Sequence, residues 1–376
     1  MVQHYLICTR CTNQMASGMN AVGCDRCGGP LDVGYVPDGS STYYDKRRGM
    51  HVPLPISGIE SLQAVSMGEG NTPTVQLTAV GGMLGAREIR AKLEYLGPTG
   101  SFKDRGTVIM MAMALEAGVK EVVEDSSGNA GASVSAYAAR VGIKAHIFAP
   151  ATAPAAKLRQ IKAYGATVHS IEGPREAATA AAVAFYKERG MVYTSHVLSP
   201  YFAEGTKVFA YETAEQMRDS IPAHIVFPVG NGSLIIGAWK GFTELQRAGR
   251  IARMPKLHCV QARGVMPIVT AATGKQRPAG VSGTVAGGIA VGAPARKEQV
   301  VSVVKASQGS IIAVDDADTL RWQKALCERE GIFGEPTSAA GFAGLEALIK
   351  RGDIGPAETV LVPVTGFGLK DAIAPG

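Results

Sequence analysis

The chain has 376 residues with a formal net charge of +6, and 46% of its residues are hydrophobic. This length suits two domains with a small additional module, and the apolar fraction is sufficient for a large buried core. Lysines and arginines are spread along the chain, no apolar run is long enough to span a membrane, and the start MVQHYLICTRC is unlike a secretory signal, so we expect a cytoplasmic protein that binds neither nucleic acid nor membranes.

The N-terminal segment contains four of the six cysteines, arranged as two CxxC pairs. Two such turns supply four thiolates, which form the closed tetrahedral shell of a structural zinc ion, Zn2+. The alternative is two redox pairs or four free thiols, but the spacing favours zinc. The expected ligands are Cys8, Cys11, Cys24 and Cys27. Residues 1–35 are therefore predicted to form a zinc ribbon, in which the metal stabilises the fold and takes no part in catalysis.

Residues 36–65 contain three prolines and show little periodicity, so they are predicted to be a linker that wraps onto the main body. From residue 87 onward, strands and helices alternate. The predicted strands cover residues 87–94, 121–125, 144–149, 166–171, 191–195, 224–228, 256–261 and 359–363. The predicted helices cover residues 107–118, 130–141, 154–164, 174–189, 206–219, 233–248, 315–330 and 337–350. This βαβ repeat predicts an α/β protein whose parallel sheet is covered by helices on both faces.

Lys103 lies in a turn rich in glycine and proline, GPTGSFKDRG at residues 97–106, between the first predicted strand and the first predicted helix. A lysine in such a turn can bind a phosphate, or its amine can form an imine with a carbonyl carbon. The turn by itself leaves both roles open.

Ligands of parallel sheets bind beyond the carboxyl ends of the strands, so the loops that follow strands are the candidate sites. The loop Ser126-Ser127-Gly128-Asn129-Ala130 follows one strand and opens a helix of small residues. Its hydroxyls and backbone N–H groups suit a carboxylate. The alternative is an ordinary helix-capping turn.

Two further loops have complementary chemistry. Gly230-Asn231-Gly232-Ser233 follows a strand and opens the helix at 233–248, so its N–H groups can bind one phosphate. Thr365 follows the last strand, and its hydroxyl can meet a ring nitrogen or bond the backbone. With Lys103, the three loops supply a phosphate cradle, a carboxylate cradle, a ring-nitrogen partner and an amine. This set of groups suits pyridoxal 5'-phosphate (PLP) with an amino-acid substrate.

Six segments together resemble the threonine synthases, within the tryptophan-synthase-β-like family of PLP enzymes (fold type II). They are GEGNTP (68–73), PTGSFKDRG (98–106), SSGNAGAS (126–133), PVGNGS (228–233), EPTSAAG (335–341) and TGFGLKD (365–371). The match runs in order over residues 60–371, and an N-terminal zinc ribbon also occurs in some threonine synthases and in cysteate synthases. The resemblance implies two doubly wound parallel-sheet domains in addition to the ribbon, and a homodimer. The larger, PLP-binding domain would comprise residues 66–106 and 196–376, and the smaller nested domain residues 107–195.

The resemblance also implies roles for single residues. Lys103 would form the imine with PLP and then act as the base that moves the Cα proton. The implied cofactor-binding residues are Lys103, Asn129, Gly230, Asn231, Gly232, Ser233, Leu234 and Thr365. The implied substrate-binding residues are Ser126, Ser127, Gly128 and Ala130. His196, which follows the predicted strand at 191–195, is interpreted as a loop histidine held by its neighbours rather than as a base.

The sequence departs from the threonine synthase pattern in the segment VLSPYF at residues 197–202. The family carries serine, asparagine and arginine where this chain has Val197, Ser199 and Phe202. Loss of a guanidinium removes a bidentate donor from a phosphate site. The loop with Ala130 is closer to that of serine and threonine dehydratases. The residues that bind PLP are therefore expected to be retained, whereas use of O-phosphohomoserine is left open.

The hypothesis that follows is a PLP-dependent carbon–oxygen lyase or synthase of threonine-synthase type, which eliminates or replaces a group at Cβ or Cγ of an amino acid. The alternatives are a dehydratase-like deaminase of serine or threonine and a cysteate-synthase-like β-replacement enzyme. A non-catalytic binding protein is a further alternative, which the retained lysine disfavours.

Overall fold

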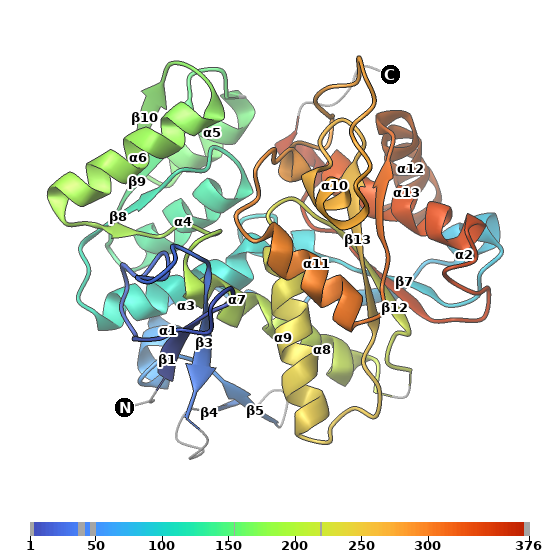
Figure 1. The fold of residues 1–376 in the computed structure, drawn as a ribbon, viewed down its shortest axis with the longest axis horizontal. Helices are drawn as coiled ribbons and strands as arrows, with labels where there is room; N and C mark the ends of the chain where they lie inside the picture. The colour runs from blue at the N-terminus through green and yellow to red at the C-terminus, as the bar shows by residue number, and fades with distance from the viewer. Residues whose placement is uncertain (1–3, 37–41, 46–49, 154, 219, 372–376) are drawn as a thin grey trace. The chain divides into compact units, whose positions relative to one another are not determined.

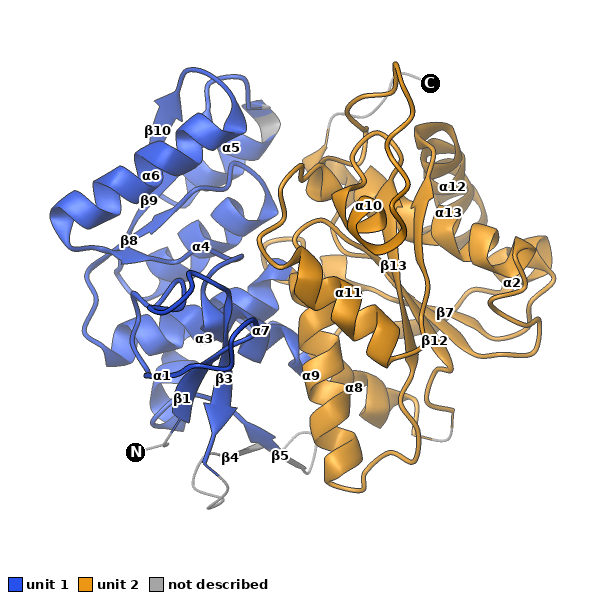
Figure 2. Ribbon diagram, viewed as in Figure 1, with its two compact units in different colours: residues 1–69, 103–208 blue, residues 70–102, 209–376 orange. Residues whose placement is uncertain are grey.

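The structure is a computed structural model that describes residues 4–36, 42–45, 50–153, 155–218 and 220–371. The chain divides into two compact units, shown in blue and orange in Figure 2. Unit 1 comprises residues 1–69 and 103–208, and unit 2 comprises residues 70–102 and 209–376. The chain therefore passes from one unit to the other between Phe102 and Lys103. The domain boundaries expected near residues 106 and 196 stay a prediction.

The N-terminal part of unit 1 is built from short antiparallel strands. Strands β1 (His4–Cys8), β2 (Gln14–Ala16) and β3 (Leu31–Tyr35) form a sheet in the order β2-β1-β3. A hairpin of β4 (Thr42–Asp45) and β5 (Met50–Pro53) and the helix α1 (Ile59–Val65) follow. Residues 37–41 and 46–49 of the predicted linker lie outside the described residues.

The main sheet of unit 1 is parallel throughout, with the strand order β10-β9-β8-β11. Its strands are β8 (Glu121–Glu124), β9 (Lys144–Pro150), β10 (Thr167–Ile171) and β11 (Val192–Tyr193). The helices of this part of the chain are α3 (Lys103–Glu116), α4 (Asn129–Arg140), α5 (Ala155–Ala163), α6 (Arg175–Arg189) and α7 (Pro200–Thr206). Residues 130–138 of α4 are all buried, and most of them are alanine, glycine or serine, whose small side chains let this helix pack closely on β8 and β9.

Unit 2 contains a six-stranded sheet in the order β14-β13-β12-β15-β7-β6. Strands β7, β12 and β13 of this sheet are labelled in Figure 1. Its strands are β6 (Thr74–Gln76), β7 (Ile89–Lys92), β12 (His224–Pro228), β13 (Lys256–Ala262), β14 (Ile311–Val314) and β15 (Val360–Pro363). The pairs are parallel except that β6 runs antiparallel to β7. The helices are α2 (Thr78–Leu84), α8 (Val208–Gln216), α9 (Ser233–Arg247), α10 (Pro267–Thr273), α11 (Lys297–Ala306), α12 (Asp316–Glu330) and α13 (Pro336–Lys350).

The core of unit 2 lies between this sheet and the helices α12 and α13. Helix α13 contacts all four strands from β12 to β15, and α12 packs on α13. Trp322 of α12 and Phe342 of α13 are fully buried in this layer. The predicted α/β class with parallel sheets is therefore confirmed, with the antiparallel edge strand β6 as an addition. Among the described residues, no helix is long and apolar enough to cross a membrane.

Candidate active site

Lys103 is the first residue of α3, so the helix begins four residues earlier than the predicted start at residue 107. The preceding turn belongs to unit 2. Gly100 has a φ of +82°, a conformation that favours glycine. The backbone N–H of Phe102 donates to the carbonyl oxygen of Thr365 at 3.0 Å, and the N–H of Phe367 donates to Gly100 at 3.0 Å. Two predicted site segments far apart in sequence are thus brought together, since Thr365 contacts the residue that precedes Lys103.

Within unit 1, Lys103 lies beside the ring of Phe202, with 5.7 Å from its Nζ to the ring centroid. Phe202 is on α7 and is buried. Helices α3 and α7 can approach closely because glycines lie at their contact. A Cβ on Gly106 would meet the Phe202 ring at 2.6 Å, and a Cβ on Gly205 would collide with the Arg105 carbonyl. These glycines therefore place an apolar ring next to the candidate lysine.

The loop at 126–130 is the junction between β8 and α4. Gly128 is the N-cap of α4, and its N–H donates to the hydroxyl of Ser126 at 3.3 Å. The first hydrogen bond that Gly128 accepts within the helix comes from the N–H of Ala132, at 3.1 Å. The N–H groups of the first helical turn have no partner within the helix and lie at its positive end. The loop can therefore bind a carboxylate, as its sequence predicts, although the role of each residue stays a prediction.

The glycine loop at 230–234, in unit 2, likewise connects a strand to a helix, here β12 to α9. Gly232 is the N-cap of the 15-residue helix α9 and has a φ of +87°. A Cβ on Gly230 would meet the carbonyl oxygen of Gly288 at 2.9 Å, and one on Gly232 would collide with Val300. Only glycine fits at both positions, so the backbone of this turn packs closely against its neighbours. A helix start of this kind is suited to a phosphate.

Thr365 lies at the carboxyl end of β15 and is buried. Its Oγ1 is 3.2 Å from the Oγ of Ser338 on α13, and the N–H of Gly366 donates to the same Ser338 oxygen at 3.2 Å. Ser338 was not singled out in the sequence, although it lies within the EPTSAAG segment. The sequence gives little indication of a role for Ser338, because a serine in the first turn of a helix is common.

A buried acid and a histidine lie close to Lys103 in unit 1. Glu124 ends β8, has no exposed surface, and its Oε1 is 2.8 Å from Nδ1 of His196. The backbone N–H of His196 donates to the other carboxyl oxygen at 3.3 Å. Burial raises the pKa of Glu124 well above its usual value, with Asp125 adding to the effect. Burial, with the charge of Lys103, lowers the pKa of His196 well below its usual value.

The four N-terminal cysteines form one cluster, and their sulfur atoms all lie within 4.8 Å of one another. They form no disulfide. The Cys8 sulfur accepts the N–H groups of Arg10 and Cys11 at 3.4 and 3.5 Å, as in a tight CxxC turn. A Cβ on Gly29 would approach the sulfurs of Cys8 and Cys27 to 3.0 and 3.2 Å. The cluster is compatible with a small zinc site.

Lys103, Thr365 and the loops at 126–130 and 230–234 are called the PLP-like set of groups below. Comparison with known proteins identifies the family of enzymes to which a chain with this set belongs. The family model described as "Pyridoxal-phosphate dependent enzyme" matches residues 65–366. The chain is 35% identical to the threonine synthase of Methanocaldococcus jannaschii over 92% of this chain and 88% of that protein. It is 34% identical to the threonine synthase of Methanosarcina acetivorans over 98% and 92% of the two chains.

The chain belongs to the pyridoxal-phosphate dependent enzymes.

Solved structures agree with this family at the level of the fold. Maize serine racemase has a TM-score of 0.67 and 24% identity, and the match covers 82% of this chain and 93% of that one. Threonine deaminase isoform 2 from Solanum lycopersicum has a TM-score of 0.67 and 22% identity, over 81% and 85% of the two chains.

The residues present fit the cofactor of a pyridoxal-phosphate dependent enzyme. Unit 2 offers the glycine cradle at 230–234 for the phosphate, and Thr365 offers a buried hydroxyl. Ser101, two residues before Lys103, is fully buried, and its hydroxyl has no hydrogen-bond partner among the described residues. A buried polar group of this kind indicates a missing partner such as a ligand atom. Unit 1 offers Lys103 itself and the loop at 126–130.

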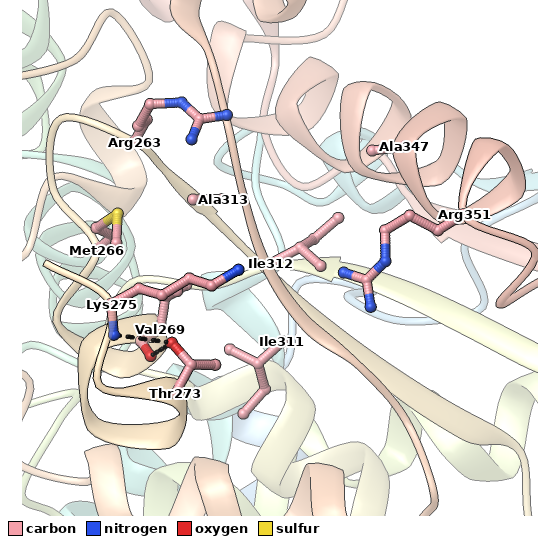
Figure 3. Close-up of a pocket in the computed structure, with 10 residues that line it drawn as sticks. All are labelled: Arg263, Met266, Val269, Thr273, Lys275, Ile311, Ile312, Ala313, Ala347 and Arg351. Atoms are coloured by element: carbon pink, nitrogen blue, oxygen red, sulfur yellow. Dashed lines mark hydrogen bonds between the residues drawn. The ribbon is translucent and has the colours of Figure 1, made fainter. Parts of the chain in front are cut away.

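A separate cavity of about 400 Å³ lies in unit 2, at the edge strand β14 (Figure 3). It is lined by apolar side chains such as Ile311 and Ile312 and by three cationic residues, Arg263, Lys275 and Arg351. Asp315 pairs with Arg263 at 2.7 Å, and Asp353 pairs with Arg351 at 3.1 Å. Lys103, Thr365 and the loops at 126–130 and 230–234 are not among the residues that line it, so this cavity is distinct from them.

Proposed function

We propose that this protein is a PLP-dependent lyase or synthase that eliminates or replaces a group at Cβ or Cγ of an amino acid. The observation that carries the proposal is the segment around Lys103. The lysine opens α3 directly after a turn that is hydrogen-bonded to Thr365, within a chain that is 35% identical to a threonine synthase.

In this proposal, different residues of the chain have different roles in binding and catalysis. Lys103 would hold the cofactor through its amine, and the same amine would accept the Cα proton of the substrate. The N–H groups of the loop at 126–130 bind the substrate carboxylate. PLP, when bound, draws electron density away from Cα. The hydroxyl of Thr365, a neutral and buried group, would be the partner of the pyridine nitrogen; such a partner would not hold a proton on that nitrogen, which suits elimination and replacement.

The residue next to Lys103 favours a second candidate. Phe202 is buried beside Lys103 and offers neither charge nor a hydrogen-bond donor to a phosphate leaving group. Val197, in the same segment, is also apolar. These side chains support a deaminase of the dehydratase type, acting on serine or threonine, beside the synthase that uses O-phosphohomoserine.

Product analysis separates these candidates. We would incubate the PLP-loaded protein with O-phosphohomoserine, threonine and serine in parallel, with Lys103→Ala as the control. Threonine and phosphate from O-phosphohomoserine support the synthase. A 2-oxo acid and ammonia from threonine or serine, with O-phosphohomoserine unchanged, support the deaminase. If the loaded wild-type protein forms none of these products, both the synthase and the deaminase are overturned.

We also propose that Cys8, Cys11, Cys24 and Cys27 bind a structural zinc ion. The four sulfurs satisfy the ligand number of a closed tetrahedral site, so no position is left for substrate. The metal would therefore stabilise the short antiparallel sheet of β1, β2 and β3 and take no part in the reaction.

A further inference from the structure

Helix α7 contacts two parts of unit 1 that are far apart in sequence, the strand β3 and the helix α3. All three elements belong to unit 1 (Figure 2). Strand β3 is part of the sheet of β1, β2 and β3, called the N-terminal sheet below, whereas α3 begins with Lys103. Helix α7 carries Phe202, whose ring lies beside the Lys103 Nζ. The helix therefore connects the N-terminal sheet with the lysine.

Tyr201 is the first anchor between α7 and the N-terminal part of the chain. Its side chain is buried, and its hydroxyl oxygen accepts the backbone N–H of Gly18 at 3.2 Å. The ring of His4 on β1 meets the Tyr201 ring edge-on, with 5.8 Å between the two centroids. Because Tyr201 directly precedes Phe202, these contacts hold the turn of α7 that also carries the ring beside Lys103.

Tyr35, the last residue of β3, is the second anchor. Its hydroxyl donates to the carboxylate of Glu204 on α7, which is paired with Lys207 at 2.7 Å. The Lys207 ammonium also lies over the Tyr35 ring, 4.7 Å from its centroid. Glu204 and Lys207 have no exposed surface, and a buried ion pair is stable only when further hydrogen bonds satisfy its charged groups. Tyr35 supplies one of these bonds, so α7 depends on the N-terminal sheet for a partner of its buried carboxylate.

The cysteine cluster lies next to both anchor points in the chain. Cys11 and Cys24 close the loop that contains Gly18, since their sulfur atoms are 3.7 Å apart. Cys8 ends β1, which pairs along its length with β3, the strand that ends at Tyr35. A structural zinc site supplies folding energy to the segments that bear its ligands. The positions of Gly18 and Tyr35 should therefore depend on the metal.

We propose that the N-terminal sheet is a control element for Lys103: through Tyr201 and Tyr35 it holds α7, and with it the Phe202 ring, against the lysine amine. The proposal rests on the proposed function of Lys103. Tyr201 and Tyr35 are positioning residues, since they act through Phe202. When the cysteine cluster holds zinc, the ring shields the amine. When the metal is lost, α7 loosens and the amine becomes more exposed.

The Phe202 ring affects Lys103 in two ways that have the same sign. The ring excludes water and reagents from one side of the amine, and a ring face within about 6 Å favours the charged ammonium form. An ammonium group is not a nucleophile, so loosening of α7 should raise the reactivity of the amine on both counts. Asp104, which accepts a hydrogen bond from Ser133 at 2.7 Å, and Arg105 are the charged neighbours of Lys103 on α3. Both are retained in every variant below.

The test is the rate at which acetic anhydride acetylates Lys103 in the full-length chain without cofactor, at one pH, followed by mass spectrometry of the Lys103 peptide. Tyr201→Phe and Tyr35→Phe keep the rings and remove only the hydroxyl groups. We expect each variant to raise the rate about two- to fivefold, the effect of losing a cation–π contact at a partly exposed site. Hydrogen exchange of the α7 peptide should rise as well. In the loaded enzyme, the visible band of lysine-bound PLP should shift.

The matched control is Asn20→Ala. Asn20 lies in the same loop as Gly18, but its side-chain oxygen accepts the N–H of Tyr193 on β11, at 3.4 Å. This variant removes a contact between the N-terminal part of the chain and a different element, so the Lys103 rate should equal that of the wild type. Wild-type rates in both tyrosine variants, or an equal rise in Asn20→Ala, overturn the proposal. These outcomes are independent of whether the protein has the proposed activity.

A second measurement tests the role of the metal. Addition of zinc to the metal-free chain should lower both the acetylation rate of Lys103 and the hydrogen exchange of α7. Cys8→Ser should abolish this response, whereas Cys327→Ser, outside the cluster, should retain it. If zinc does not bind to the cysteine cluster, or binds there and changes neither quantity, control by the metal is overturned.

Discussion

Phe202 shows how single residues shape the surroundings of Lys103. Its ring lies against Gly106, one helical turn after the lysine, and has room only because Gly106 has no side chain. The position of Lys103 relative to α7 thus depends on a residue that takes no part in the chemistry.

Replacement of Gly106 by alanine should therefore destabilise unit 1. The added Cβ would approach the Phe202 ring to 2.6 Å, and overpacking of this kind costs about 1–3 kcal/mol. Chemical denaturation should show this loss in the free energy of unfolding. The control is Gly82→Ala in α2, where a Cβ meets nothing within 4 Å. This change should leave stability equal to or above that of the wild type. Equal stability of both variants would contradict the described packing.

Residue types with few possible roles could be identified from the sequence. Lys103 and the glycines at 230 and 232 were predicted to be site residues because each lies in a loop that follows a predicted strand, and their roles stay a prediction. Glu124 could not be assigned in this way, since an acid at a strand end is most often solvent-exposed. Its hydrogen-bond partner, His196, is 72 residues away in the sequence. The sequence interpretation of His196 as a residue held by its neighbours agrees with this contact, but the identity of the neighbour required the fold.

At the scale of elements, α12 and α13 are joined by a polar contact around Glu346, whose side chain is partly buried. Its carboxylate accepts hydrogen bonds from Trp322 and Lys350, both at 2.9 Å, and from Arg321. Burial acts to raise the pKa of Glu346, but these hydrogen bonds outweigh it and lower the pKa to about 2.

This shift predicts a pH-dependent contribution to stability. Because the folded-state pKa is depressed, the stabilisation is fully present above the unfolded pKa of about 4.3 and is lost as the pH falls through about 2. Glu346→Gln should cost about 1–3 kcal/mol near pH 7, the usual contribution of hydrogen bonds to a charged group.

Denaturation of the Glu346→Gln variant at a series of pH values checks this expectation. The difference from the wild type should shrink between about pH 5 and pH 2. The control is Glu328→Gln, which removes a more exposed carboxylate that pairs with Lys324 at 3.8 Å. A constant difference across this pH range would contradict the proposed role of Glu346.

The sheet of β1, β2 and β3 is a small element, and Cys8 of the cysteine cluster is the last residue of β1. We expect one zinc ion per chain in metal analysis of the purified protein. Cys8→Ser should abolish binding and expose the N-terminal sheet to proteolysis, whereas Cys327→Ser, outside the cluster, should retain the metal. Absence of stoichiometric zinc together with free reactivity of all four thiols would contradict a zinc site.

The elements of the βαβ repeat were predictable because buried strands and amphipathic helices follow each other at a regular spacing. The strands β8, β9, β12, β13 and β15 lie within about two residues of the predicted bounds. Strand β14 and helices α7, α10 and α11 were missed. The region from residue 274 to 295 is rich in glycine and proline and interrupts the repeat, and β14 is only four residues long. The antiparallel direction of β6 depends on its pairing with β7, which no local pattern shows.

At the scale of the whole molecule, the chain passes between two units directly before Lys103. Unit 1 holds Lys103 and the loop at 126–130, and unit 2 holds the loop at 230–234 and Thr365. The PLP-like set of groups could be recognised in the sequence because each loop follows a strand of a parallel sheet. The chain belongs to the pyridoxal-phosphate dependent enzymes, and the central claim is that Lys103 is the residue that binds the cofactor.

The most direct measurement is mass spectrometry of the protein after it has been loaded with PLP, reduced with borohydride and digested. The account predicts that the mass of the reduced cofactor is found on the peptide that contains Lys103, and that Lys103→Ala carries none. Attachment to a different lysine, or failure of the folded wild-type protein to retain PLP, would contradict it.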